Sequence, residues 1–265
     1  MGDLEGRVAV VVGGGQTPGE TIGNGRATAV LFAREGAQVV VADRNAASAQ
    51  ETVEMIRSEG GEAVSLVADV EVEDSLIELS RKTIEHFARI DVLHNNVGIS
   101  IAGGDARVED IDVEAFDRVT NVNLRGMVLT CKHVLPIMRD QRRGAIINVS
   151  SMAAWKPYPL IGYKTTKVGV IALTEQLAQQ NARYNIRANV ILPGLMNTPM
   201  AIESRVAQGT PREEVIELRD KQVPLGRKMG SAWDVAHAAA FLACDKAGFI
   251  TGVSLPVDGG ASVSG

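Results

Sequence analysis

Short apolar runs rich in valine and isoleucine recur along the chain, and longer segments of helical pattern separate them. Such runs are typical of strands that are buried on both faces of a parallel sheet. About seven of them fit within one domain, at Arg7–Val12, Gln38–Asp43, Glu62–Asp69, Asp91–Gly98, Gly144–Ser151, Ile186–Gly194 and Gly252–Gly260.

Helical periodicity fills the intervals between these runs. The first expected helix is Gly25–Ala37, and its apolar face carries Ala27, Val30, Leu31 and Phe32. An Ala/Glu-rich segment predicts a second helix that ends near Gly60 and Gly61. Further helices are expected at Glu73–Phe87, Glu114–Arg139, Lys164–Tyr184 and Ala232–Cys244. Strands that alternate with helices predict one α/β domain over residues 1–265. We expect a Rossmann-like, doubly wound parallel sheet with right-handed crossovers.

One stretch, Leu195–Gly230, breaks the regular alternation. It contains Pro199, Pro211 and Pro224 among scattered charges. An irregular insertion late in an α/β domain is often a lid, so we interpret residues 195–230 as a substrate loop. A helical surface hairpin that binds no ligand is the alternative.

Composition excludes several classes of protein. A chain of 265 residues with 45% hydrophobic content can bury a sizeable core, and its net charge of −5 argues against nucleic-acid binding. Cys131 and Cys244 lie far apart in apolar helical contexts, so we expect reduced core residues. The histidines lack ligand spacing, so no metal site is expected. Without a signal peptide or an apolar run of about 20 residues, a cytoplasmic protein with no membrane partner is expected.

The glycine-rich stretch after the first strand, VVVGGGQTPGETIGNGRATA (Val10–Ala29), has two interpretations. From Gly14 it reads G-x-x-x-x-G-E-T, which is close to a nucleoside-triphosphate loop. Glu20, however, stands where a lysine should neutralise the phosphates. From Gly23 it reads G-N-G at the start of a helix, where backbone N–H groups bind a pyrophosphate. The sequence therefore favours a dinucleotide over a triphosphate.

Asp43 ends the second strand, eighteen positions beyond Gly25. At that spacing a carboxylate can accept hydrogen bonds from an adenosine ribose, and it would repel a 2′-phosphate. This favours NAD over NADP. Arg44 points the other way, because a guanidinium attracts the same phosphate.

Tyr163 and Lys167 lie four positions apart in YKTTK, so they share one face of a helix. An ammonium group stabilises a phenolate, and the pKa of such a tyrosine is expected below its usual value of about 10. The phenol can then act as an acid or a base on an alcohol/carbonyl pair. Ser150 and Ser151 end a strand, and Ser151 precedes Tyr163 by twelve positions. Either hydroxyl is placed to bind a substrate oxygen.

Taken together, these motifs resemble the short-chain dehydrogenase/reductase family, in the subgroup with subunits of about this length. The resemblance covers essentially the whole chain and includes NNVG (Asn95–Gly98), NVNL (Asn121–Leu124), INVSS (Ile147–Ser151), YKTTK (Tyr163–Lys167) and ILPGLMNTPM (Ile191–Met200). It implies an oxidoreductase that transfers a hydride between NAD(H), rather than NADP(H), and a secondary alcohol or ketone. A homotetramer built through Glu114–Arg139 and Tyr163–Tyr184 is also implied.

The resemblance assigns roles to particular residues. The catalytic set would be Asn123, Ser151, Tyr163 and Lys167, with Ser150 as the alternative serine because its separation from the tyrosine is the commoner one in the family. The cofactor would lie against Gly13, Gly15, Ile22, Gly23, Asn24, Gly25, Asp43, Asp69, Val70, Asn96, Gly98, Tyr163, Lys167, Pro193, Met196 and Thr198.

The glycine turn departs from the family pattern T-G-x-x-x-G-x-G. Val12 replaces the threonine, and QTPGET (Gln16–Thr21) is a six-residue insertion. We expect this insertion to flank the cofactor entrance and to offer the Thr17 or Thr21 hydroxyl, with Glu20 facing solvent. A surface bulge without cofactor contact is the alternative.

Trp155, Pro157, Tyr158, Met200, Ile202 and Val206 are expected to face the substrate. They favour an apolar, cyclic or aromatic alcohol or ketone. One alternative is a 3-oxoacyl-[acyl-carrier-protein] reductase-like enzyme that uses NADP(H), in which Lys132, Arg139, Arg142 and Arg143 would supply the docking charges. A second alternative is a non-catalytic, cofactor-sensing scaffold of the same fold.

Overall fold

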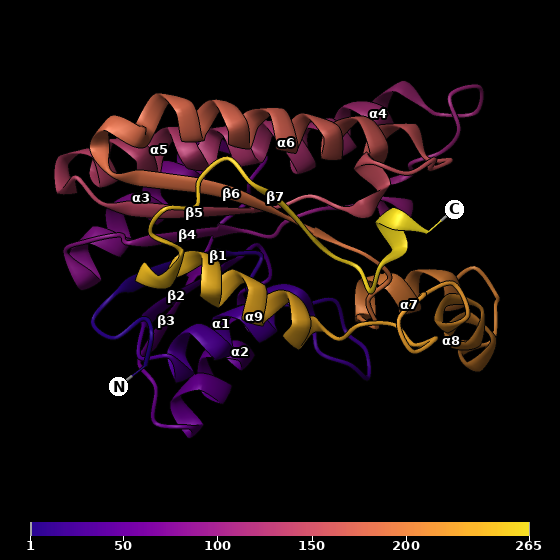
Figure 1. Cartoon of the computed structure of the whole chain (residues 1–265), viewed down its shortest axis with the longest axis horizontal. Coiled ribbons are helices and arrows are strands. Elements are labelled where there is room, and N and C mark those ends of the chain that lie inside the picture. Colours follow the sequence, from indigo (N-terminus) through magenta and orange to yellow (C-terminus); the bar gives the residue numbers. More distant parts are fainter. Residues whose placement is uncertain (1, 265) are drawn as a thin grey trace.

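The computed structural model describes residues 2–264, and a seven-stranded parallel sheet forms its centre. The strand order is β3-β2-β1-β4-β5-β6-β7, the arrangement of a doubly wound fold (Figure 1). The strands are β1 (Val8–Val12), β2 (Gln38–Asp43), β3 (Ala63–Val67), β4 (Val92–Asn95), β5 (Gly144–Val149), β6 (Ile186–Pro193) and β7 (Ser254–Val257). Each lies inside one of the runs expected from the sequence, so the fold class is confirmed.

Helices cover both faces of the sheet (Figure 1). On one face lie α1 (Asn24–Arg34), α2 (Ala46–Ser58) and α9 (Ala232–Ala243), and on the other lie α3 (Glu73–Phe87), α5 (Gly126–Gln141) and α6 (Ile161–Asn181). The remaining helices are α4 (Val113–Thr120), α7 (Pro199–Val206), α8 (Arg212–Asp220) and the short turns η1 (Ile101–Gly103), η2 (Asn121–Arg125), η3 (Met152–Ala154), η4 (Ala182–Tyr184), η5 (Asp245–Ala247) and η6 (Ala261–Val263).

Alternate residues of the central strands enter two separate cores. Val11 of β1 packs with α1, α2 and α9, whereas its neighbours Val10 and Val12 pack with α3 and α5. Full burial of such a side chain contributes roughly 1.5–3 kcal/mol. This two-sided burial explains why the strands are continuously apolar. Cys131 and Cys244 are both free and buried, as expected from the sequence.

The long helix expected at Glu114–Arg139 is interrupted. A π-helical turn, η2, joins α4 to α5 and carries Asn123. Such single wide turns are frequent at functional sites. The next long helix, α6, begins at Ile161 and therefore includes both Tyr163 and Lys167.

Residues 195–230 form a hairpin of the two helices α7 and α8, which stands beyond the carboxyl ends of the strands (Figure 1). Its small core consists of Ile202, Val215, Val223 and Met229. A parallel bridge between Met196 and Gly230 closes the base of the hairpin. The stretch is therefore a helical hairpin at the edge of the sheet where ligands bind, and its role as a substrate loop stays a prediction.

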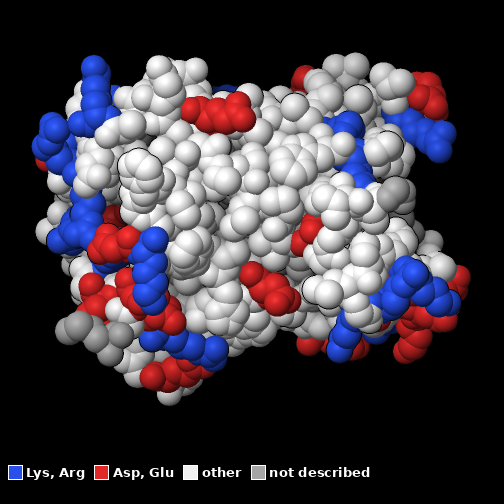
Figure 2. Space-filling model, in the orientation of Figure 1, with Lys and Arg blue, Asp and Glu red and all other residues white. Residues whose placement is uncertain are grey.

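Charged side chains gather toward the two ends of the molecule in Figure 2, and the centre of this view, over α6, β7 and α9, carries few of them. Within residues 2–264, no helix combines the length and the apolar character needed to cross a bilayer.

Candidate active site

The structure brings the expected catalytic residues together where β5, η2 and α6 meet. The Lys167 ammonium lies 5.5 Å from the centre of the Tyr163 ring. Its Nζ donates a hydrogen bond of 2.9 Å to the carbonyl oxygen of Val149, at the end of β5. Lys167 is only 2% exposed, and this hydrogen bond compensates part of the cost of burying its charge.

Burial, rather than the neighbouring cation, dominates the protonation of Tyr163. It raises the pKa of Tyr163 to about 12, although a hydrogen bond with Ser151 opposes the rise. Burial also lowers the pKa of Lys167 to about 8. The expectation that Lys167 holds the pKa of Tyr163 below its usual value is therefore not met in this structure, because removal from water disfavours both charged forms.

The two serines that follow β5 have different surroundings. The Ser150 hydroxyl is buried and donates a hydrogen bond of 2.6 Å to the carbonyl oxygen of Lys167. The Ser151 hydroxyl instead accepts one from the backbone N–H of Ala153 and lies within hydrogen-bonding reach of Tyr163. This geometry favours Ser151 as the partner of Tyr163.

Asn123 is fixed in the π-helical turn. Its Oδ1 accepts from the backbone N–H of Ile99 at 2.7 Å, and its Nδ2 donates to the Ile99 carbonyl at 2.9 Å. The amide thus ties η2 to the loop after β4. In that loop, a Cβ on Gly98 would stand 3.1 Å from Lys167 Nζ. Asn123 and Gly98 therefore border the same buried ammonium group.

Asp105, which the sequence interpretation missed, anchors the start of α6. Its two carboxylate oxygens accept hydrogen bonds from the backbone N–H groups of Gly162, at 2.9 Å, and Tyr163, at 2.8 Å. Leu160, at the N-cap position, supplies no side-chain bond. A remote carboxylate thus does the work of a cap and complements the helix dipole. It also fixes the backbone of the residue that carries the phenol.

The backbone at the end of β1 fits a dinucleotide. A Cβ on Gly15 would stand 2.9 Å from Asp43 Oδ2, and a Cβ on Gly25 would stand 1.9 Å from the Gly13 carbonyl oxygen. These close approaches favour glycine at both positions. No side chain caps the start of α1, and its first turn holds no acidic residue. Within residues 2–264, the side-chain oxygens of Asn24 and Asn197 are buried without a hydrogen-bond partner. The uncapped helix start suits an anion, and the two amide oxygens suit a ligand that also carries hydrogen-bond donors.

Other expected cofactor residues lie at the same edge of the sheet. Asp43 ends β2, and its carboxylate accepts from the backbone N–H groups of Gly15 and Asn45. Pro193 ends β6, and the remaining ones follow β3, β4 and β6, where Asp69, Val70, Asn96, Met196 and Thr198 are found. Asn96 Nδ2 donates to the Gly13 carbonyl oxygen at 3.1 Å, which joins the loop after β4 to the glycine turn.

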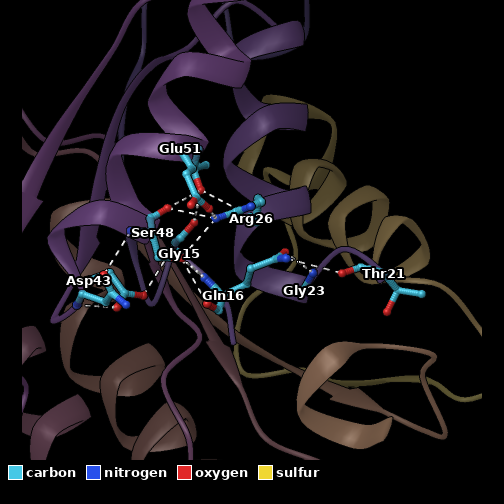
Figure 3. A network of polar contacts seen from close by, with 11 residues as sticks. Gly15, Gln16, Thr21, Gly23, Arg26, Asp43, Ser48 and Glu51 are labelled. Carbon is cyan, nitrogen blue, oxygen red and sulfur yellow. Dashed lines mark hydrogen bonds and ion pairs between the residues drawn. The ribbon is translucent and has the colours of Figure 1, made fainter. Parts of the chain in front are cut away.

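The insertion Gln16–Thr21 is held by a polar network (Figure 3). Gln16 Oε1 accepts from the backbone N–H of Gly23 at 2.9 Å, and the backbone of Gln16 exchanges two hydrogen bonds with the Ser48 hydroxyl. The buried Arg26 donates to Ser48 and to Thr52, and it forms an ion pair with Glu51. Gln16, the first residue of the insertion, is therefore hydrogen-bonded into the glycine turn.

The outer end of the insertion contacts the α7–α8 hairpin. Gly19 lies against Pro199 and Glu203. Glu20 is largely exposed, as expected, but its carboxylate also lies 3.3 Å from Arg212, which binds Glu203 at 2.6 Å. The insertion thus connects the glycine turn to the segment interpreted as the substrate loop.

Of the side chains expected to face the substrate, Tyr158 packs against Tyr163. Its ring centre is 5.6 Å from that of Tyr163. Trp155 and Met200 are 49% and 43% exposed, and their place beside the substrate stays a prediction. Ile202 is a correction: it is fully buried in the core of the hairpin, because α7 turns that face toward α8.

Comparisons with known proteins agree with this geometry. A family model described as enoyl-(acyl carrier protein) reductase matches residues 20–262. A chain described as a short-chain dehydrogenase/reductase from Burkholderia xenovorans superimposes with a TM-score of 0.94 at 37% identity, covering 100% of both chains. A structure of levodione reductase does so with a TM-score of 0.91 at 34% identity, covering 99% of this chain and 100% of that one.

Two relatives show the range of activities among similar sequences. Levodione reductase of Leifsonia aquatica is 35% identical over 97% of this chain and 95% of its own length. A 3-oxoacyl-[acyl-carrier-protein] reductase of Thermotoga maritima is 35% identical over 97% and 98%. The chain therefore belongs to the short-chain dehydrogenase/reductase family, and it is an oxidoreductase that acts on CH–OH groups.

Replacement of Asp105 by alanine tests its role as an anchor of α6. The change leaves two backbone N–H groups without acceptors, at a cost of about 1–3 kcal/mol, and should lower the midpoint of thermal unfolding by several degrees. The control Asp112→Ala removes the ordinary cap of α4, which is remote in sequence from α6. Both variants should be destabilised, but only Asp105→Ala should also lower kcat. Equal kcat in the two variants would contradict a positioning role for Asp105.

Replacement of Gln16 by alanine removes the side-chain oxygen that accepts a hydrogen bond from the Gly23 N–H. This bond joins the start of the insertion to the residue that precedes α1. We expect a loss of about 1 kcal/mol in the free energy of unfolding, measured by denaturant titration. Thr17→Ala is the matched control, because Thr17 is exposed in the same insertion. If both variants are as stable as the parent protein, the insertion is a bulge that does not support the turn.

Proposed function

We propose that this enzyme is an NAD-dependent dehydrogenase or ketone reductase whose substrate is a secondary alcohol or ketone with an apolar, cyclic body. The observation that carries the proposal is the convergence of Ser151, Tyr163 and Lys167 at the end of β5. Two hydroxyl groups beside a buried ammonium group can bind one carbonyl oxygen, and one of them can donate or accept one proton. Hydride transfer to or from a carbonyl carbon requires the protein to bind the oxygen and to transfer this proton.

The glycine turn, the start of α1 and Asp43 are the residues that would hold the pyrophosphate and the adenosine ribose. The nicotinamide end would lie near Asn197 and Thr198, after β6. When bound, the cofactor supplies or accepts the hydride. The proposal rests on the fit of the backbone cradle and on the two buried asparagine oxygens that lack partners in the described chain.

In the reductive direction, Tyr163 acts as the proton donor. Because burial raises the pKa of Tyr163 to about 12, the phenol is protonated at neutral pH and can donate to the substrate oxygen while Ser151 binds the same atom. In the oxidative direction it is the phenolate form of Tyr163 that takes the proton from the alcohol and becomes the phenol. The Lys167 ammonium group stabilises this phenolate before the transfer, and it keeps its charge below a pH of about 8.

Asp43 supports NAD rather than NADP. Its carboxylate is held in place by the N–H groups of Gly15 and Asn45, and it retains lone pairs for ribose hydroxyls. A second phosphate at this point would meet a fixed negative charge. Arg44 is exposed and has no hydrogen bond or ion pair within residues 2–264, so nothing orients it toward a phosphate.

The acyl-carrier-protein alternative has less support. The basic side chains that it requires are already engaged within the chain. Lys132 pairs with Glu73, Arg139 binds the Asn181 amide, Arg142 binds the Arg183 carbonyl, and Arg143 pairs with Asp245. The same proposal includes a homotetramer. Val128 on α5 and Val168 on α6 are exposed, which suits contacts between copies of these helices.

Tyr163→Phe tests the acid/base assignment. We expect kcat to fall by about a thousandfold or more, because the variant cannot exchange a proton, while the dissociation constant of NADH changes little. Tyr158→Phe is the matched control, since its ring lies beside that of Tyr163 at an angle of 45°. It should retain turnover within about tenfold. The assays use cyclohexanone-type ketones with NADH and NADPH in parallel. Substantial turnover by Tyr163→Phe would show that another group moves the proton.

Asp43→Asn tests the cofactor preference. Removing the negative charge while keeping the size should raise kcat/KM for NADP about tenfold or more relative to NAD, equivalent to about 1.4 kcal/mol. Glu54→Gln makes the same change of charge at an exposed position on α2 and should leave the ratio unaltered. An unchanged ratio in Asp43→Asn would mean that this carboxylate does not select the cofactor.

A further inference from the structure

An arginine on the inner face of α8 has no carboxylate partner. Arg219 follows Val215 by four positions, so it shares the helix face that enters the core of the hairpin. Its Nε lies 3.2 Å from the sulfur of Met229, and its Nη2 lies 3.5 Å from the Met196 carbonyl oxygen. These are weak contacts for a charged group with five donors. Within residues 2–264, Arg219 takes part in no ion pair.

Arg212, on the same helix, shows what a structural arginine looks like here. Its guanidinium group binds both carboxylate oxygens of Glu203 and also contacts Glu20. These ion pairs join the hairpin to the insertion. Arg219 forms no comparable ion pair within the described residues, although its guanidinium group is more deeply buried than that of Arg212.

A second arginine increases the positive charge at this point. Arg205 of α7 donates to the Ala201 carbonyl oxygen, and it too has no ion pair within the described residues. Burial and the nearby Arg205 together lower the pKa of Arg219 to about 10, while Tyr158 and Asp220 oppose the change. Asp220 acts on Arg219 only from a distance, because no ion pair joins the two within the described residues, and its Oδ1 accepts a hydrogen bond from the Met229 N–H. Two neighbouring cations in a partly desolvated place are unfavourable without an anion.

The place of Arg219 connects it to the catalytic residues. It is close enough to Tyr158 for the phenol to raise its pKa, and the ring of Tyr158 lies tilted against that of Tyr163, with 5.6 Å between their centres. On its other side it reaches the backbone of Met196, which follows β6. Figure 2 shows basic and acidic side chains gathered on the α7–α8 end of the molecule, in contrast to its weakly charged centre.

We propose that Arg219, assisted by Arg205, binds a carboxylate on the substrate, so that this enzyme acts on a hydroxy acid or an oxo acid. The carboxylate lies across the site from the reacting carbon, and the apolar body of the substrate lies between them against Tyr158. A guanidinium group binds a planar carboxylate through two parallel hydrogen bonds. The inference rests on the proposed function, since it names the substrate class of the same site.

A matched pair of ketones tests this inference. The probes are 4-oxocyclohexanecarboxylate and the neutral 4-oxocyclohexanecarboxamide, assayed with NADH. The parent enzyme should prefer the acid by about 10- to 100-fold in kcat/KM, the range expected for hydrogen bonds to a charged group. Arg219→Met should abolish the preference, chiefly through KM for the acid, and should change the amide less than about threefold. Arg219→Lys should restore part of it.

Lys221→Met is the control for net charge, because Lys221 is exposed and pairs only with Glu217 on the outer side of α8. It should behave as the parent protein. Three results would overturn the inference. The parent enzyme could use the amide as well as the acid, Arg219→Met could impair both ketones equally, or it could weaken NADH binding, which would assign the charge to the cofactor.

A binding measurement separates this inference from the proposed function. The dissociation constant of cyclohexanecarboxylate, which has no reducible group, is measured by calorimetry for the parent protein and for Arg219→Met in the presence of NADH. Binding at least tenfold weaker in the variant supports the carboxylate site even if neither ketone is reduced. Equal binding, or none to the parent protein, overturns it. Absence of turnover with both ketones counts against the proposed function instead.

Discussion

The architecture of the site depends on one close backbone approach, between the start of α1 and the end of β1. A Cβ on Gly25 would stand 1.9 Å from the Gly13 carbonyl oxygen, and this oxygen also accepts the Asn96 amide. Glycine alone allows the helix to begin so near the strand. Because Gly13 and Gly25 are held together, any residues added between them have to leave the sheet and travel outward.

The outward path of the insertion brings it to the α7–α8 hairpin, where Arg212 follows Glu20 by 192 positions in the sequence. The exposed contact between Glu20 and Arg212 adds little stability by itself, about 0–1 kcal/mol. The buried end matters more, because Gln16, Ser48 and Arg26 satisfy one another's polar groups where water is largely excluded. The glycine turn is therefore held firmly at its base, and its outer part contacts the α7–α8 hairpin.

Features that depend on local pattern were predictable from the sequence, and features that depend on distant partners were not. Continuous apolar runs gave the seven strands, and the spacing of Tyr163 and Lys167 placed both on one helix face. Asp105 lies in an irregular loop and meets the start of α6 more than fifty positions later, so no periodicity reveals it. Burial reverses the expected pKa shift of Tyr163, and burial is a property of the packed fold rather than of spacing. For Arg219 the sequence offers one indication, because it lies four residues after the buried Val215 and so shares its face of the helix.

The contrast between Arg212 and Arg219 bears on how such a site selects its substrate. An apolar pocket discriminates weakly, since one methylene group changes the binding free energy by only about 1–3 kcal/mol. An arginine that stays without a carboxylate in the free protein is different, because a substrate lacking the matching anion leaves it desolvated and unpaired. The penalty then falls on the wrong substrate rather than on the right one. A hairpin that already has Arg212 for its own cohesion gains no stability from a second, unpaired guanidinium group, and selectivity is the physical property that this group can add.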